Sequence, residues 1–343
     1  MDKKRGQLIL QIFLLVCLVG IGIYFLLFNK KEVIACSDST EINSCSIVKP
    51  YFCEQEKLIE KASTCGCPLN STVSGESCIS NYQTNATEIS LDYILRGKKG
   101  TINYTVYQGV YDYFSKLSSL INLNDNPSLQ DFRLKRLNQE VQLEFLYPLI
   151  LKIENITLVK QDQLRIATSL VQNIPFGNSQ RAIQIGKEKM NYQRYAYEVL
   201  YEKEGVCSEK SELLVFLLRG LGYDTSFIYY PLENHEVVGV KCPEKNAIKN
   251  TSYCFIETTG PSIITDDKTE YVGNEKLNSI PGVIEISQGL SLDKYSYEFR
   301  DAKVLISIRE TMKKLGKINF IQHIQFKRIK KEYGLPEFTN YQF

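Results

Sequence analysis

Apolar residues recur with helical spacing in three stretches of the chain. From Ser128 to Leu149 they alternate with polar residues at intervals of three and four, and Ser128 is suited to cap the helix. Gln161 to Ile174 repeats this amphipathic pattern and stops at Pro175. Cys207 to Gly220 has "LLVFLL" near its centre, and this middle part is apolar on nearly all sides. This last stretch therefore predicts a buried helix.

Three short apolar segments follow the predicted buried helix. They are "YDTSFIYY", "HEVVGVKC" and "YCFIETT", separated by polar loops, and they read as strands. Beyond them, "YEFRDAKVLISIRETMKKLG" predicts another helix, and "FKRIKKEYG" near the end is basic. A basic run is usually a solvated face, and contact with anionic lipid or a cell-wall polymer is the alternative. The pattern as a whole predicts an α+β fold.

The N-terminal region has a different character. Leu8 to Phe28 carries no charge, and about 20 apolar residues suffice to cross a bilayer. Lys3, Lys4 and Arg5 precede it, which favours a cytoplasmic N-terminus. One alternative is a cleaved signal peptide, but the apolar run is long for one. Another is a lipoprotein cleavage site at "VIAC", but charged residues separate this motif from the apolar run. We expect a retained single-pass membrane anchor.

The cysteines indicate an oxidising compartment. Six of them cluster after the anchor, where the sequence is too poor in apolar residues for a core of its own, and two more flank a polar loop. A metal knuckle is less suitable, because "CGC" is too tight for zinc and no His is near. The disulfide candidates, whose pairing the sequence leaves open, are Cys36, Cys45, Cys53, Cys65, Cys67, Cys78, Cys242 and Cys254. Five Asn-x-Ser/Thr acceptors give weak further support: Asn70, Asn85, Asn103, Asn155 and Asn250.

Cys207 has no obvious disulfide partner and stands at the start of the predicted buried helix. The helix dipole and the unpaired N–H groups there favour an anion, which lowers the pKa of a thiol. A thiolate needs a base, and His235 opens the second predicted strand; Glu257, on the third, is a suitable acid to orient it. Gln172 is a candidate oxyanion donor, with the backbone N–H of Cys207 as the safer one. No cofactor and no metal ligands are expected.

The strand register leaves one conflict. If Cys242 and Cys254 were directly opposite each other, Glu257 would face Gly239, and His235 would lie about 13 Å away along its strand. The catalytic pair and the disulfide are compatible only with a diagonal disulfide, a bulge, or a His235 placed just before the ladder.

The order Cys, His, acid on a helix followed by antiparallel strands resembles the transglutaminase-like superfamily of papain-like folds. "YEVLYEKEGVCSEKS", "LLRGLGYDTSFIYY", "HEVVGV" and "FIETTGPS" are similar in order and wording to archaeal membrane-anchored members. Glu209 departs from the pattern where an Asp is expected, and Glu257 stands where the wider superfamily has Asp. The resemblance implies thiol acyl-transfer chemistry through a thioester, ending in peptide hydrolysis or amine transfer. Tyr197 resembles a family aromatic near the site, although core packing explains it equally well.

Together these observations predict five regions. They are an anchor (1–30), a disulfide module (31–80), a mainly helical region (88–170), the catalytic domain (171–290), and a C-terminal helix with a basic tail (291–343). We expect an extracytoplasmic body acting on a protein or peptide at the cell surface. A net charge of +2 gives no reason to expect nucleic acid. A non-catalytic envelope binding or assembly module on the same fold is the alternative.

Overall fold

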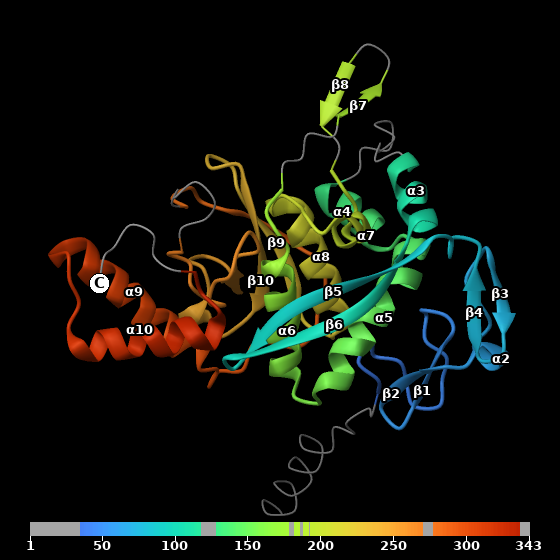
Figure 1. Cartoon of the computed structure of the whole chain (residues 1–343), viewed down its shortest axis with the longest axis horizontal. Helices are drawn as coiled ribbons and strands as arrows, with labels where there is room; N and C mark the ends of the chain where they lie inside the picture. The colour runs from blue at the N-terminus through green and yellow to red at the C-terminus, as the bar shows by residue number, and fades with distance from the viewer. Residues whose placement is uncertain are drawn as a thin grey trace, which may run out of the picture.

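A four-stranded antiparallel sheet lies at the centre of the molecule (Figure 1). The computed structural model describes residues 35–117, 128–177, 193–269 and 277–336, and the backbone of 182–185 and 188–191. The sheet has the order β11-β10-β9-β12. Its strands are β9 (Thr225–Tyr230), β10 (His235–Lys241), β11 (Tyr253–Ile256) and β12 (Gly282–Glu285). Helices and this sheet pack together, which confirms the α+β class.

Helix α8 (Cys207–Gly220) packs against β10 and β9 and is buried on nearly all sides, as predicted. Helices α6 (Lys160–Asn173) and α7 (Ala196–Glu202) contact it from other directions. Because every face of α8 meets another element, an apolar side chain is stabilising at each position of "LLVFLL". The helix is therefore a rigid support for the residue at its N-terminus.

The register of β10 and β11 resolves the conflict found in the sequence. Cys254 is opposite Val240, so the Cys242–Cys254 disulfide is diagonal. The β10–β11 ladder begins at Val238, and His235 therefore lies before it. On this register Glu257 is only two positions from His235, where a direct pairing of the cysteines would have separated them by four.

The predicted helix from Ser128 is two helices, α4 (Leu129–Leu137) and α5 (Glu140–Ile156). Ser128 caps α4 through a capping box with Asp131, as its sequence position predicted. The backbone leaves the helical conformation at Gln139, which is extended (φ −61°, ψ 123°). The spacing of apolar residues continues across this break, so the pattern alone does not reveal it.

The region expected to be mainly helical opens with a long hairpin. Strands β5 (Ala86–Leu95) and β6 (Lys98–Tyr107) pair over their full length, before α3 (Gln108–Lys116). Arg96 and Gly97 both have positive φ, the conformation that joins two strands most tightly. The hairpin covers α6 and meets the C-terminal helices at its tip (Figure 1).

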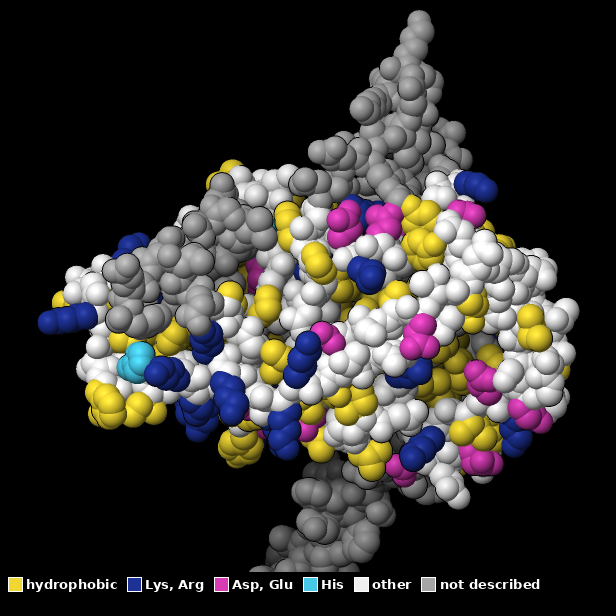
Figure 2. Space-filling view, in the orientation of Figure 1, with side chains coloured by type: hydrophobic (Ala, Val, Ile, Leu, Met, Phe, Trp, Pro, Cys, Tyr) yellow, Lys and Arg dark blue, Asp and Glu magenta, His cyan; other side chains and the backbone are white. Residues whose placement is uncertain are grey.

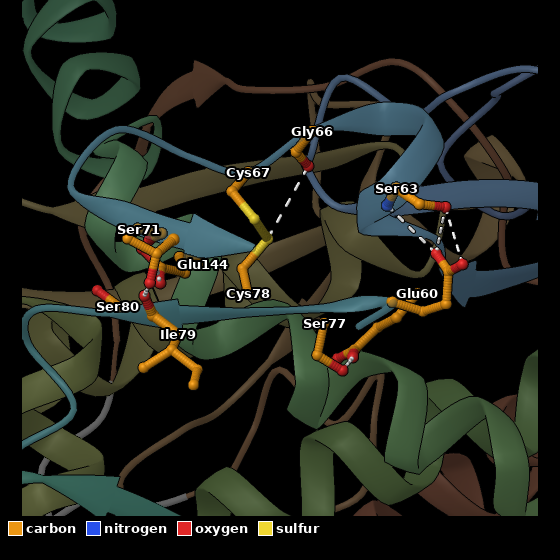
Figure 3. Close-up of a disulfide and its surroundings, with 12 residues drawn as sticks. Glu60, Ser63, Gly66, Cys67, Ser71, Ser77, Cys78, Ile79, Ser80 and Glu144 are labelled. Carbon is orange, nitrogen blue, oxygen red and sulfur yellow. Dashed lines mark hydrogen bonds between the residues drawn. A yellow bond between two sulfur atoms is a disulfide. The ribbon is translucent and has the colours of Figure 1, made fainter. Parts of the chain in front are cut away.

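Residues 35–80 form the predicted disulfide module. It holds β1 (Tyr51–Glu54), β2 (Lys57–Glu60), α2 (Ala62–Cys65), β3 (Ser71–Ser74) and β4 (Ser77–Ser80). All six cysteines pair within it, as Cys36–Cys53, Cys45–Cys65 and Cys67–Cys78. Figure 3 shows Cys67–Cys78 beside β3, where the Ser71 hydroxyl donates to Glu144 of α5 (3.3 Å). The module is thus cross-linked internally and bonded to the body.

The C-terminal region contains two helices where the sequence predicted one helix and a tail. Helix α9 (Glu298–Leu315) is the predicted one, and the basic segment lies in α10 (Phe320–Tyr333). They form a hairpin at the left of Figure 1, with a small core of its own.

Strands β7 (Ala182–Ile185) and β8 (Glu188–Asn191) form a further hairpin, and Glu244–Asn246 is a 3₁₀ turn. Among the residues described, no helix combines the length and apolarity that crossing a membrane requires. The anchor predicted at Leu8–Phe28 lies outside the described residues.

Candidate active site

Cys207 is the first residue of α8 and is partly exposed, while the helix behind it is buried. Among the described residues, Cys207 is the one cysteine that forms no disulfide, and the other eight cysteines there are all paired. Its sulfur lies where the helix dipole and unpaired N–H groups stabilise negative charge. The thiol is therefore both accessible and placed next to groups that favour an anion.

His235 begins β10 and is 2% exposed. Its Nε2 lies 2.9 Å from Oε2 of Glu257, and its ring also hydrogen-bonds to Cys207. Since Nε2 contacts Glu257, Nδ1 is the nitrogen available to the thiol. Asn234, directly before it, has positive φ (46°), so the strand enters the sheet from a tight turn. The three predicted catalytic residues are thus brought together by α8, β10 and the end of β11.

Glu257 follows β11 and is held by a dense set of hydrogen bonds. Its Oε1 accepts from the backbone N–H of Thr258 (2.9 Å) and of Thr259 (2.8 Å), and from the Thr259 hydroxyl (2.8 Å). Its Oε2 is left for His235. The carboxylate therefore has one orientation, and that orientation fixes the imidazole ring.

Burial disfavours the charged forms of His235 and Glu257, but their hydrogen bonds and mutual attraction favour these forms more strongly. Burial alone would lower the pKa of His235; its hydrogen bonds to Cys207 and Glu257, and their charges, instead raise it to about 9. Burial would raise the pKa of Glu257, but its bond to His235 and the Thr259 donors lower it. Protonated His235 beside ionised Glu257 is consequently the favoured state near neutral pH.

The loop after Glu257 is also bonded to the helix that carries Cys207. The Thr258 hydroxyl donates to the carbonyl oxygen of Cys207 (3.4 Å) and lies 3.2 Å from the Ser211 hydroxyl. Ser211 in turn donates to the carbonyl of Glu236, next to His235 (3.3 Å). These contacts join the three elements of the site directly, so their relative positions do not depend on packing alone.

Lys210 is a functional candidate that the sequence analysis did not identify. It lies one turn after Cys207, is fully buried, and donates from Nζ to the carbonyls of Ile174 (2.5 Å), Thr259 (3.3 Å) and Gln172 (3.5 Å). Burial lowers its pKa to about 8, while the charge of Glu257 opposes this shift. A lysine in a helix predicted to be buried was the available signal. Lys210 links the end of α6 to the loop that holds Glu257.

Replacing Lys210 with Met is expected to lower the free energy of unfolding by about 2 kcal/mol, because buried carbonyls lose a charged donor. The measurement is urea unfolding followed by circular dichroism. Lys203→Met, an exposed lysine just before α8, is the control and should change stability by less than about 0.5 kcal/mol. Equal stability of the two variants would contradict the structural role given to Lys210.

Gln172 does not lie as the oxyanion hypothesis requires. Its amide nitrogen donates to the carbonyl of Glu257 (2.8 Å) and to both oxygens of Ser262 (3.1 and 3.3 Å). The side chain thus supports the loop behind the carboxylate, and we do not assign it to the oxyanion. The backbone N–H of Cys207 remains the suitable donor.

Three further residues, Tyr197, Asp266 and His323, have contacts or positions that assign them no role in the candidate site. Tyr197 is buried among Phe114 and Phe145, in accordance with core packing. Asp266, an acid in the loop after Glu257, pairs with Arg309 of α9. His323 lies on α10, at the C-terminal hairpin.

Glu209, where the resemblance led us to expect Asp, caps the helix that carries Cys207. Its carboxylate accepts from the backbone N–H of Val206 (3.0 Å) and of Arg194 (2.9 Å). The longer Glu side chain reaches both donors, which fixes the segment leading into α8. Glu209 therefore has a capping role in this chain.

A buried charge cluster lies on the other side of α8. Arg136 donates to Glu212 (2.6 Å), and Arg133 donates to Glu236 (2.5 Å), the neighbour of His235. Burial raises the pKa of Glu236 to about 7, against the charge of Arg133. The cluster joins α4 to α8 and β10 and so supports the site from behind.

In the described part of the chain, no group of three or more His, Cys, Asp or Glu side chains is arranged to hold a metal ion. The sequence matches no protein-family model, and it has no significant match among curated proteins.

Proposed function

We propose that this chain is a membrane-tethered, extracytoplasmic thiol enzyme on a transglutaminase-like, papain-like fold. One observation carries the proposal: His235 bonds to both Cys207, at a helix N-terminus, and the buried carboxylate of Glu257. Nucleophile, base and orienting acid in this geometry match the requirements of covalent acyl transfer. Cys207 is the nucleophile, His235 the base and acid, and Glu257 the positioning acid.

In the first half-reaction, the Cys207 thiolate attacks the carbonyl carbon of an amide. The oxygen becomes an oxyanion, which the backbone N–H of Cys207 is placed to stabilise. Protonated His235 then gives its proton to the leaving nitrogen. The C–N bond breaks, an amine departs, and a thioester remains on Cys207.

In the second half-reaction, His235 removes a proton from water or from a primary amine as it attacks the thioester. The C–S bond breaks, the thiolate returns, and His235 is protonated again. Water gives hydrolysis, and a Lys amine gives an isopeptide bond. The chemistry of the triad is the same in both cases.

The disulfides and the predicted anchor support the proposed location. Four disulfides are typical of proteins in an oxidising compartment. With a cytoplasmic N-terminus, the body would face outward and meet a protein or peptide substrate at the cell surface.

Iodoacetamide labelling of the native full-length protein tests the proposed nucleophile. Near neutral pH, Cys207 should be alkylated rapidly, because its thiol is partly exposed and hydrogen-bonds to His235, while the eight paired cysteines should react only after reduction. Peptide mapping by mass spectrometry separates Cys207 from Cys17, which lies in the predicted anchor. His235→Ala should slow alkylation of Cys207 without releasing another thiol. Slow labelling unaffected by His235→Ala would instead favour the binding-module alternative.

A further inference from the structure

The end of the α9–α10 hairpin exposes a cluster of large apolar side chains. Leu315, Phe320, Ile321 and Ile324 are 69%, 78%, 67% and 52% exposed. Gly316, with positive φ, ends α9, and Asn319 caps α10, so a short turn brings these residues to one end. We call this surface the hairpin tip.

The hairpin tip is separate from the core of the same helices. Ile308, Phe326 and Ile329 are buried to 2% or less between α9, α10 and the body. Because these residues already supply the packing, the exposed apolar residues are not required to hold the hairpin together. Apolar exposure of this kind usually marks an interaction surface.

Basic side chains surround the hairpin tip. Lys313, Lys314, Lys317 and Lys327 are exposed, and the sequence contains no Asp or Glu between Thr311 and Lys331. Figure 2 shows Lys and Arg side chains gathered over this end of the molecule, with hydrophobic side chains exposed beside them. Its charge is therefore complementary to an anionic surface.

We propose that the hairpin tip docks onto a bilayer containing anionic lipid, with its apolar residues in the interfacial layer and its lysines at the headgroups. Large apolar residues flanked by Lys are the combination that binds such an interface. The predicted anchor holds the body close to a bilayer: Ala35 follows Phe28 by seven residues, or at most about 25 Å of extended chain. Tethering makes the contact intramolecular, so a modest affinity suffices. The contact would fix the orientation of the body on the membrane, and it does not depend on the proposed enzyme activity.

The absence of Trp from the chain provides a direct test, since Phe320→Trp introduces a single Trp at the hairpin tip. The full-length variant is placed in proteoliposomes of phosphatidylcholine alone or with phosphatidylglycerol. With the anionic lipid, Trp emission should shift to the blue and be quenched by lipids brominated on their acyl chains. Leu69→Trp is the control: Leu69 is 73% exposed in the disulfide module, at the opposite side of Figure 1. Its emission should not depend on lipid charge.

A second variant tests the lysines. Lys313→Glu, Lys314→Glu and Lys317→Glu, combined with Phe320→Trp, should abolish quenching, since each Lys contributes about fivefold to membrane binding. The matched control also carries Phe320→Trp but reverses the charge of three exposed lysines elsewhere, Lys57, Lys116 and Lys135. Its Trp should still be quenched.

Three results would overturn the proposal. An unquenched Trp at position 320, or equal quenching with and without anionic lipid, would show that the tip does not recognise an anionic bilayer. A blue shift in detergent that vanishes on dilution would show instead that a second copy of the chain covers the tip.

Discussion

Cys207→Ala is expected to reduce acyl-transfer activity by about 10⁴-fold or more while leaving the fold intact, because it removes the thiol that hydrogen-bonds to His235. The residue is partly exposed at a helix start, so removing its sulfur leaves no large cavity. Activity is measured as ammonia release from a glutamine-containing peptide, and as transfer of that peptide to a fluorescent alkylamine.

Ser208→Ala, the next residue on the same turn, is the matched control and should retain activity. Circular dichroism should show the same unfolding transition for both variants. Full activity of Cys207→Ala would remove the basis of the enzyme proposal. A binding or assembly module would then be the better account.

Glu257→Gln is expected to lower kcat/KM by about 100-fold and to shift its dependence on pH. In the native protein His235 has a pKa of about 9, partly because of the Glu257 charge, so it is protonated below that pH and loses its proton above it. Activity that needs the imidazolium should therefore fall as the pH rises through about 9. Without the carboxylate charge, the pKa of His235 should decrease, and the fall should begin at lower pH.

The measurement is the pH profile of kcat/KM for both proteins. Glu257→Ala should cost more activity than Glu257→Gln, because an amide oxygen can still hold the ring nitrogen. Asp267→Asn is the control for loss of one negative charge nearby, since Asp267 and Glu257 both act on Tyr230, the strand partner of His235, and its profile should match the native one. An unchanged alkaline limb in Glu257→Gln would show that Glu257 does not set the charge of His235.

The sequence predicted the local elements around the site with close agreement. The helix from Cys207, the amphipathic helix before Pro175 and the strand beginning at His235 are present with nearly the predicted bounds. Each has a spacing of apolar residues, a cap or a breaker that acts within a few residues, so local chemistry was sufficient. The break at Gln139 and the helical character of the basic C-terminal segment were missed, because neither changes the local pattern decisively.

The sequence by itself determined that the chain has an apolar N-terminal segment, a disulfide-rich module, an α+β body and, outside the apolar segment, one cysteine without an obvious partner. Only the tertiary structure decided the strand register that brings His235 within 2.9 Å of Glu257, and the diagonal disulfide that permits it. It alone showed that Lys210 supports the site and that Gln172 holds a loop. The physical reason is that helices and strands follow local periodicity, whereas register and side-chain partners depend on contacts between residues tens of positions apart.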